Sequence, residues 1–164
     1  MKYLFASLFM AAAVLAGCSK ATVEPEPAEQ VIGTYVVDKI TQSLKYATSP
    51  TENSQTFNLP FSGANGYKLS ATIDLSKKSA NTLTAVYTET ETEGGKTTMN
   101  PQPLNSIELK KADSAPAGQF DMYDGATKIG TVGNGLITVE EQETGKDSLG
   151  RAYIFIFRIT GKKG

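Results

Sequence analysis

The 164-residue sequence contains no histidine and no tryptophan, and Cys18 is its single cysteine. The lack of histidine removes the side chain most often used as a general base or metal ligand near neutral pH. A disulfide within the chain is excluded, because it needs two cysteines. Charge of one sign is not in excess, since 16 basic and 17 acidic side chains leave a net charge of −1. This balance predicts no nucleic-acid partner, because nucleic-acid-binding domains present a basic face.

Motifs for catalysis or metal binding are also missing. There is no Gly-x-Ser-x-Gly elbow, and no glycine-rich phosphate loop precedes a helix. Asp121, Asp124 and Gly125 do not have the spacing of a calcium-binding loop, and a tight turn explains Asp124-Gly125. The glutamates of segment 140–143 are typical of a solvated strand end. We therefore expect no catalytic residue, no metal site and no cofactor, and we predict that the protein is not an enzyme.

The N-terminus has a short positive start at Lys2, followed by an apolar run over residues 3–16. This run is shorter than the ~20 residues that a membrane-spanning helix needs, and it has the proportions of a secretory signal. Small residues at positions 16 and 17 lead directly to Cys18.

The tetrapeptide Leu-Ala-Gly-Cys at 15–18 resembles the lipobox of bacterial lipoproteins. The resemblance implies that residues 1–17 are a signal peptide removed by cleavage before Cys18. It further implies that Cys18 carries a diacylglyceryl group and an N-acyl chain such as palmitate. Three acyl chains anchor a protein firmly to a bilayer. The expected location is the cell envelope of a Gram-negative bacterium, with the outer membrane favoured and the choice between its periplasmic and outer surface left open.

Residues 18–30 show no apolar periodicity. Pro25 and Pro27 favour an extended path, and Glu24, Glu26 and Glu29 add solvation. This composition predicts a flexible acidic tether that joins the lipidated Cys18 to one folded domain over residues 31–164.

Past residue 30 the hydrophobic period is two, which is typical of half-buried strands. The segment 67–75 is the clearest case, because Tyr67 and every second residue after it are apolar. Asp124-Gly125 and Asn134-Gly135 are typical of tight hairpin turns, whereas Pro101 and Pro103 indicate a loop. The segment 41–54 is ambiguous. The pattern predicts about eight strands, near 31–40, 54–59, 67–75, 82–91, 105–111, 118–123, 127–132 with 136–141, and 151–160.

Strands joined in this way predict an all-β protein, an antiparallel up-and-down meander that closes into a barrel. A two-layer β-sandwich is the alternative. In either fold the apolar faces are expected to be buried, including Leu69, Ile73, Leu83, Phe120, Phe155 and Phe157. The residues predicted to line either a ligand cavity or a packed core are Tyr67, Leu69, Tyr87, Phe120, Tyr153, Phe155 and Phe157.

Gly33-Thr34-Tyr35 on the first strand resembles the Gly-x-Trp opening of lipocalins, with tyrosine in place of tryptophan. The resemblance implies a calycin-like barrel with room for a ligand. It also implies that Tyr35 closes one barrel end and that a basic side chain of the last strand, Arg158, packs on it. Strand parity opposes this pairing, because Arg158 alternates with Phe157 and Ile159 and should point outward unless a bulge rotates it. Tyr35 itself is predicted to be buried.

Two functions remain open at this level. The first is a lipid-anchored envelope binding module that holds a small apolar or amphipathic ligand in its barrel. The second is a structural or interaction protein with a solid barrel, whose loops contact a protein or a glycan. A cavity of a few hundred Å³ is typical of the first, and an exposed aromatic patch over a filled core is typical of the second.

Overall fold

The computed structural model describes residues 24–49, 51–111 and 116–164, and its strands form one antiparallel sheet. A short helix, α2 (Pro27–Val31), precedes the first strand, and a 3₁₀ turn, η1 (Ala64–Gly66), precedes the fourth. The strands are β1 (Gly33–Tyr46), β2 (Glu52–Asn58), β3 (Phe61–Ser62), β4 (Lys68–Ser79), β5 (Thr82–Glu93), β6 (Lys96–Lys110), β7 (Gln119–Asp124), β8 (Thr127–Gly133), β9 (Leu136–Lys146) and β10 (Ala152–Lys163).

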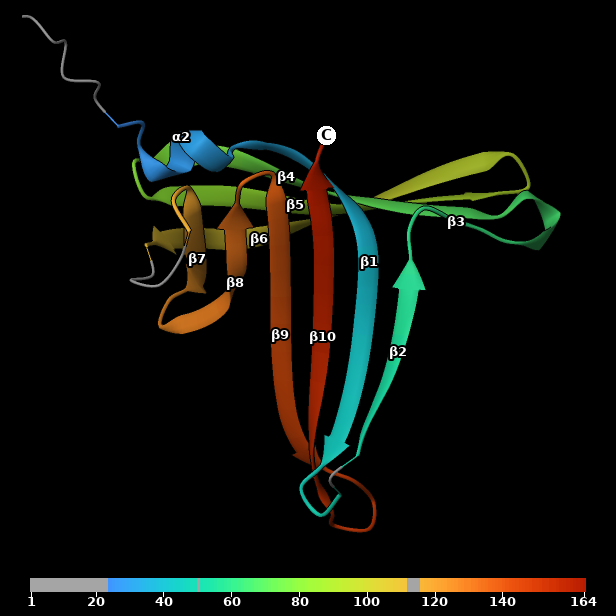
Figure 1. Ribbon diagram of the computed structural model, residues 1–164. Coiled ribbons are helices and arrows are strands. Elements are labelled where there is room, and N and C mark those ends of the chain that lie inside the picture. Colours follow the sequence, from blue (N-terminus) through green and yellow to red (C-terminus); the bar gives the residue numbers. More distant parts are fainter. Residues whose placement is uncertain (1–23, 50, 112–115) are drawn as a thin grey trace, which may run out of the picture.

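Eight of these strands close into a barrel (Figure 1). From β4 to β10 each strand pairs with the next one along the chain, and β1 pairs with both β10 and β4. The predicted up-and-down barrel is therefore confirmed, and the sandwich alternative is wrong. β2 and β3 are additional strands at the edges of the sheet, paired with β1 and β4 respectively.

The barrel is closed over only part of the length of its strands. β1 pairs with β4 over residues 33–36, and its register to β10 then shifts between Val37 and Lys39. From Lys39 onward β1 pairs with β2 instead. A bulge bends a strand and increases its twist, so this bulge marks the point where β1 leaves the closed barrel.

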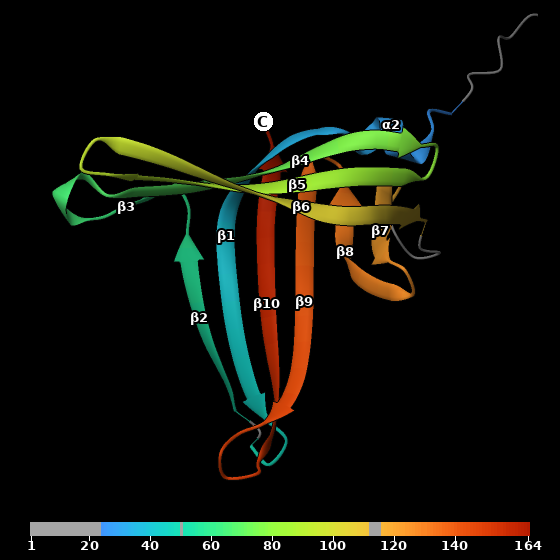
Figure 2. The same ribbon diagram turned by 180° about the vertical axis from the view of Figure 1, so that it is seen from behind.

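Beyond the closed part, the sheet extends as two arms in different directions (Figures 1 and 2). The first arm consists of β2 with residues 39–46 of β1, 140–146 of β9 and 152–158 of β10. The second arm consists of β3 with residues 68–70 of β4, 90–93 of β5 and 96–99 of β6. The barrel lies where the two arms meet (Figures 1 and 2).

The interior of the barrel is filled by side chains. Met122 and Leu83 are fully buried, as expected for an eight-stranded barrel, whose interior is just wide enough for side chains. α2 covers one end of this core through Ala28 and Val31, both 0% exposed. The other buried side chains of the barrel include Val37, Ala71, Ile73, Leu75, Ala85, Ile107, Leu109, Phe120, Val132 and Ile137.

The expected tether therefore ends earlier than predicted. Its last residues form α2, and the Ala28 N–H donates to the Ala80 carbonyl over 3.0 Å. Pro27 occupies the first turn of this helix, where a proline loses no intrahelical hydrogen bond. The sequence pattern missed the helix because five residues are too few to show a helical period. None of the helices among the described residues is long and apolar enough to span a bilayer.

The predicted loop at Pro101 and Pro103 is wrong, because both prolines lie within β6. There β6 pairs with β5 on one side, opposite Thr88 and Val86, and its pairing with β7 begins only at Glu108. Residues two apart direct their backbone nitrogens to the same side of a strand. The two missing N–H groups therefore lie on the same side of β6. An open edge such as the one beside this part of β6 is where proline costs no ladder hydrogen bond and discourages further pairing.

Candidate functional site

A cavity of about 680 Å³ lies beside the β7–β8 turn, which is at the end of the barrel opposite α2 (Figure 1). Three elements form its walls: β6, the β7–β8 hairpin and β9. Leu104, Ile129 and Val139 provide apolar surface that continues into the barrel core. The complete lining is Pro103, Leu104, Ile107, Asp124, Thr127, Lys128, Ile129, Val139, Glu140, Glu141 and Gln142.

The cavity exists because neighbouring strands stop pairing. β6 pairs with β7 only over Glu108–Lys110, and β8 pairs with β9 only over residues 130–133 and 136–139. The β7–β8 hairpin therefore pairs with its neighbours β6 and β9 only at one end, and its Asp124-Gly125 turn borders the cavity between these two strands. The predicted turn is confirmed at these positions. We call this opening, with its lining residues, the barrel mouth.

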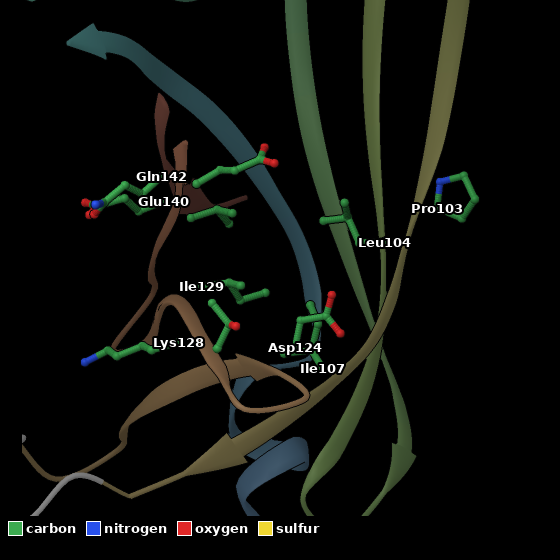
Figure 3. Close-up of a pocket in the computed structure, with 11 residues that line it drawn as sticks. Pro103, Leu104, Ile107, Asp124, Lys128, Ile129, Glu140 and Gln142 are labelled. Atoms are coloured by element: carbon green, nitrogen blue, oxygen red, sulfur yellow. The ribbon is translucent and has the colours of Figure 1, made fainter. Parts of the chain in front are cut away.

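Charged side chains lie around the barrel mouth in two orientations. Figure 3 shows Leu104 pointing into the cavity, whereas Glu140, Gln142 and Lys128 point away from it. The two outward charges have partners elsewhere. Glu140 accepts a hydrogen bond from Arg158 Nε at 2.8 Å, and Lys128 pairs with Asp121 at 2.7 Å.

Two carboxylates remain for the cavity itself. Glu141 pairs across the sheet with Phe157 and shares the inward face of β9 with Val139. Asp124 borders the cavity at the hairpin turn. Neither carboxylate takes part in any ion pair between described residues. The barrel mouth therefore combines an apolar floor with negative charge at its rim.

Gly33-Thr34-Tyr35 lies at the opposite, closed end of the barrel. Tyr35 is 1% exposed, as predicted, and its hydroxyl donates to the Val31 carbonyl at 2.8 Å. Burial raises the pKa of Tyr35, so the ring stays neutral and can donate to α2. Tyr35 thereby connects the first strand to the helix that closes the barrel.

Arg158 does not pack on Tyr35, so the pairing implied by the lipocalin resemblance is wrong. Arg158 lies opposite Thr41 and Glu140 on the outer face and forms an ion pair with Glu140 at 2.6 Å. The basic side chain that reaches the closed end is Lys163. It pairs with Tyr35 in register, and its Cε lies so near Gly33 that a β-carbon there would be 2.9 Å away. Lys163 has the same parity along β10 as Phe157 and Ile159, and this pattern could have identified it from the sequence.

The predicted lining residues separate into three groups. Tyr87 and Phe120 are in the core, and Leu69 and Phe157 pack at its margin. Burial raises the pKa of Tyr87, whose hydroxyl donates to Glu89 at 2.8 Å. Tyr153 and Phe155 lie on the first arm, Tyr67 lies between η1 and β4, and all three are partly exposed.

The prediction that Phe155 is buried is therefore wrong, and Leu69 and Phe157, which were also predicted to be buried, are only partly buried. Phe155 pairs with Leu44 of β1 and Glu143 of β9, well beyond the closed part of the barrel. No second layer of sheet covers this face of the first arm among the described residues. Leu104, Ile129 and Val139 were missed for a related reason, since alternation identifies a face but not the place where strands separate.

The predicted lipidation residue, Cys18, lies outside the described residues. No group of three or more histidine, cysteine or acidic side chains that suits a metal is present among the described residues. A second cavity of about 410 Å³ lies at the tip of the first arm, bordered by Tyr153, Gly145 and Ala47.

Fold and site together define an antiparallel eight-stranded β-barrel with two sheet extensions and a cavity at its open end. No family model and no curated protein matches the chain. Among solved structures, the chain is similar to a de novo designed fluorescence-activating β-barrel, at 14% identity and a TM-score of 0.28. That match covers 85% of this chain and 98% of the designed one.

Proposed function

We propose that the protein is a non-catalytic, lipid-anchored binding module of the cell envelope, and that its ligand occupies the barrel mouth rather than the barrel interior. The observation that carries this proposal is the cavity of about 680 Å³ at the barrel mouth. Its volume is in the range of small-molecule sites. The interior of the barrel is packed with Met122, Leu83 and their neighbours, so the mouth offers the space that the interior does not.

The chemistry of the mouth indicates an amphipathic ligand. An apolar part fits against Leu104, Ile129 and Val139, where it removes hydrocarbon surface from water. A polar end that carries hydrogen-bond donors or a positive charge fits the carboxylates of Asp124 and Glu141. Anionic ligands are disfavoured because like charges would approach in a partly dry site.

The anchor in this proposal is the diacylglyceryl and acyl group on Cys18. It is supported by the lipobox-like tetrapeptide at residues 15–18. Substituting Cys18→Ala should abolish acylation and leave an uncleaved precursor, which mass spectrometry of the N-terminal peptide detects. Continued processing and acylation of this variant would contradict the anchor.

The test of the binding function is native mass spectrometry of the full-length acylated protein purified from membranes in mild detergent. We expect a co-purified small molecule, released on denaturation, whose mass differs from those of the detergent and the phospholipids. A protein without such a mass, and without affinity for any amphiphile in the titration below, would contradict the proposal.

A matched pair of variants then tests whether the ligand binds at the barrel mouth. We expect dodecylamine, below its micellar concentration, to bind more tightly than dodecanoate. Glu141→Gln should weaken dodecylamine binding about tenfold, the usual size of one charge-assisted hydrogen bond. Glu143→Gln is the control, because Glu143 lies two residues further along the same face of β9 but outside the cavity lining. Equal losses in both variants would exclude a specific role for the mouth.

A second candidate function is favoured by the inner face of the first arm. Phe57 is 43% exposed there, and Phe155 and Phe157 are partly exposed. Exposed aromatic surface over a filled core is typical of a protein-interaction surface. A photo-crosslinking residue at Phe57, compared in intact cells with one at the outward-facing Lys45, tests this candidate. Protein crosslinks from position 57 alone would favour it.

A further inference from the structure

The chain enters the folded domain at a defined place. α2 is held on the barrel by the Tyr35–Val31 hydrogen bond and by Lys77, which forms ion pairs with Glu26 at 2.7 Å and Glu29 at 2.6 Å. Six residue steps separate Cys18 from Glu24, the first described residue. Six steps span at most about 22 Å even when fully extended. A lipid on Cys18 therefore keeps the α2 end of the barrel near the bilayer.

The same end carries exposed apolar side chains on its outer surface. Val36 and Leu136 are 44% and 55% exposed, and Ile32, between α2 and β1, is 36% exposed. The strand register places Val36 and Leu136 on either side of Lys162, in one row across β1, β10 and β9. The Lys162 side chain is 70% exposed. We call these four residues the outer patch.

The composition of the outer patch suits a membrane interface. Val36 and Leu136 gain from leaving water. The Lys162 ammonium lies 3.3 Å from Asp38 in an exposed ion pair, and because such a pair contributes little, the ammonium can turn from Asp38 to lipid phosphates while its methylenes stay in apolar surroundings. α2 and the C-terminus, which follows Lys162 by two residues, lie on the same side of the molecule in Figure 1. The turns of the first arm lie at the far end.

We propose that the outer patch rests on the bilayer in which Cys18 is anchored, so that the barrel mouth faces away from that membrane. This inference rests on the lipid anchor of the proposed function and specifies its orientation. The β7–β8 turn at the mouth lies at the end of the barrel opposite α2 (Figure 1). A ligand would therefore enter from the aqueous side and not from the lipid.

A pair of cysteine variants tests the orientation. An acylated Cys18 has no free thiol, so an introduced cysteine is the chain's single site for an environment-sensitive label. Leu136→Cys places the label in the outer patch. Leu149→Cys is the matched control, because Leu149 is a leucine that is 75% exposed in the β9–β10 turn. β9 spans about 33 Å between these two regions, at ~3.3 Å per residue. Val36→Cys provides a second reporter within the patch.

The labelled full-length proteins are reconstituted into phosphatidylethanolamine–phosphatidylglycerol vesicles that contain doxyl-labelled lipid, and circular dichroism checks their folding. We expect at least threefold stronger quenching at positions 36 and 136 than at 149.

Equal quenching at all three positions, with acyl chains present on the N-terminal peptide, would overturn the orientation and leave the anchor intact. Absence of acyl chains from that peptide would overturn both. Weak quenching at position 136, together with disulfide-linked dimers of the unlabelled Leu136→Cys variant, would assign the outer patch to a second copy of the chain and overturn the membrane contact.

Discussion

The closed part of the barrel and the first arm share β1, β9 and β10, yet the two regions bury their side chains very differently. Phe120 in the barrel is 4% exposed, whereas Phe155 on the arm is partly exposed, although both occupy the inward parity of their strands. In the barrel, an inward side chain meets the opposite wall and α2. On the arm, the same face meets no second layer among the described residues. Inward parity thus produces a core only where the sheet closes on itself.

The largest expected effect tests this contrast with one substitution at two places. Phe120→Ala should lower the free energy of unfolding by about 3–5 kcal/mol, because it leaves a cavity in a packed core. Phe155→Ala should lower it by only about 1 kcal/mol, because the side chain is already partly in water. Urea denaturation measures both values. Similar losses would mean that something covers the first arm in solution.

A close backbone contact gives the next largest effect. Gly130 has a φ of +150°, and a β-carbon there would lie within 1.9 Å of the Thr138 carbonyl oxygen. Gly130→Ala should therefore cost about 3 kcal/mol through strain and steric overlap. Gly125→Ala is the control, since φ is +58° but no atom lies within 4 Å, and its expected cost is about 1 kcal/mol. If the two variants unfold at the same urea concentration, β8 and β9 do not approach as described.

The contact between Tyr35 and α2 should have a smaller effect. Tyr35→Phe keeps the buried ring but leaves the Val31 carbonyl without its donor, at a cost of about 1–2 kcal/mol. Amide hydrogen exchange should accelerate at Ala28 and Ile32, whose N–H groups bond to Ala80 and Ala28, with little change in β5. Tyr123→Phe, on β7, serves as the control. Unchanged exchange in α2 would show that the hydroxyl does not hold the helix.

The smallest effect is a pH dependence at the same helix. The hydrogen bond and charge of Lys77 lower the pKa of Glu29 below its ordinary value of 4.5. A lowered folded-state pKa means that this stabilisation is present above pH 4.5 and is lost as the pH falls through the folded-state pKa. Lowering the pH from 6 to 3 should loosen α2 before the barrel unfolds, and Lys77→Met should remove most of this dependence. NMR titration of the α2 amides measures it, and the same titration in both proteins would assign the pH effect elsewhere.

Much of the barrel was predictable from local patterns. The alternation of apolar and polar residues predicted the strand centres. The Asp124-Gly125 and Asn134-Gly135 turns join neighbouring strands as expected. The burial of Tyr35 was also predictable, because its parity agrees with that of Val37.

The arms and the cavity were not predictable, because they depend on where strands stop pairing. Nothing local to Val139 or Leu104 indicates that β9 and β6 separate beside them. Pro101 and Pro103 were interpreted as a loop because their tolerance in a strand depends on having an open edge. Proline beside acidic residues suggested an extended tether, and the tertiary contact of Ala28 with the barrel overrode that preference.

The central claim, that ligand binds at the barrel mouth and not inside the barrel, is tested most directly by methyl NMR. The full-length acylated protein, labelled at isoleucine, leucine and valine methyl groups, is titrated with dodecylamine below its micellar concentration. The account predicts shifts at Leu104, Ile129 and Val139 that saturate together, with little change at Leu83 and Ile73 deep in the core. Larger shifts at Leu83 and Ile73 than at the mouth, or no saturable shift at the mouth, would contradict it.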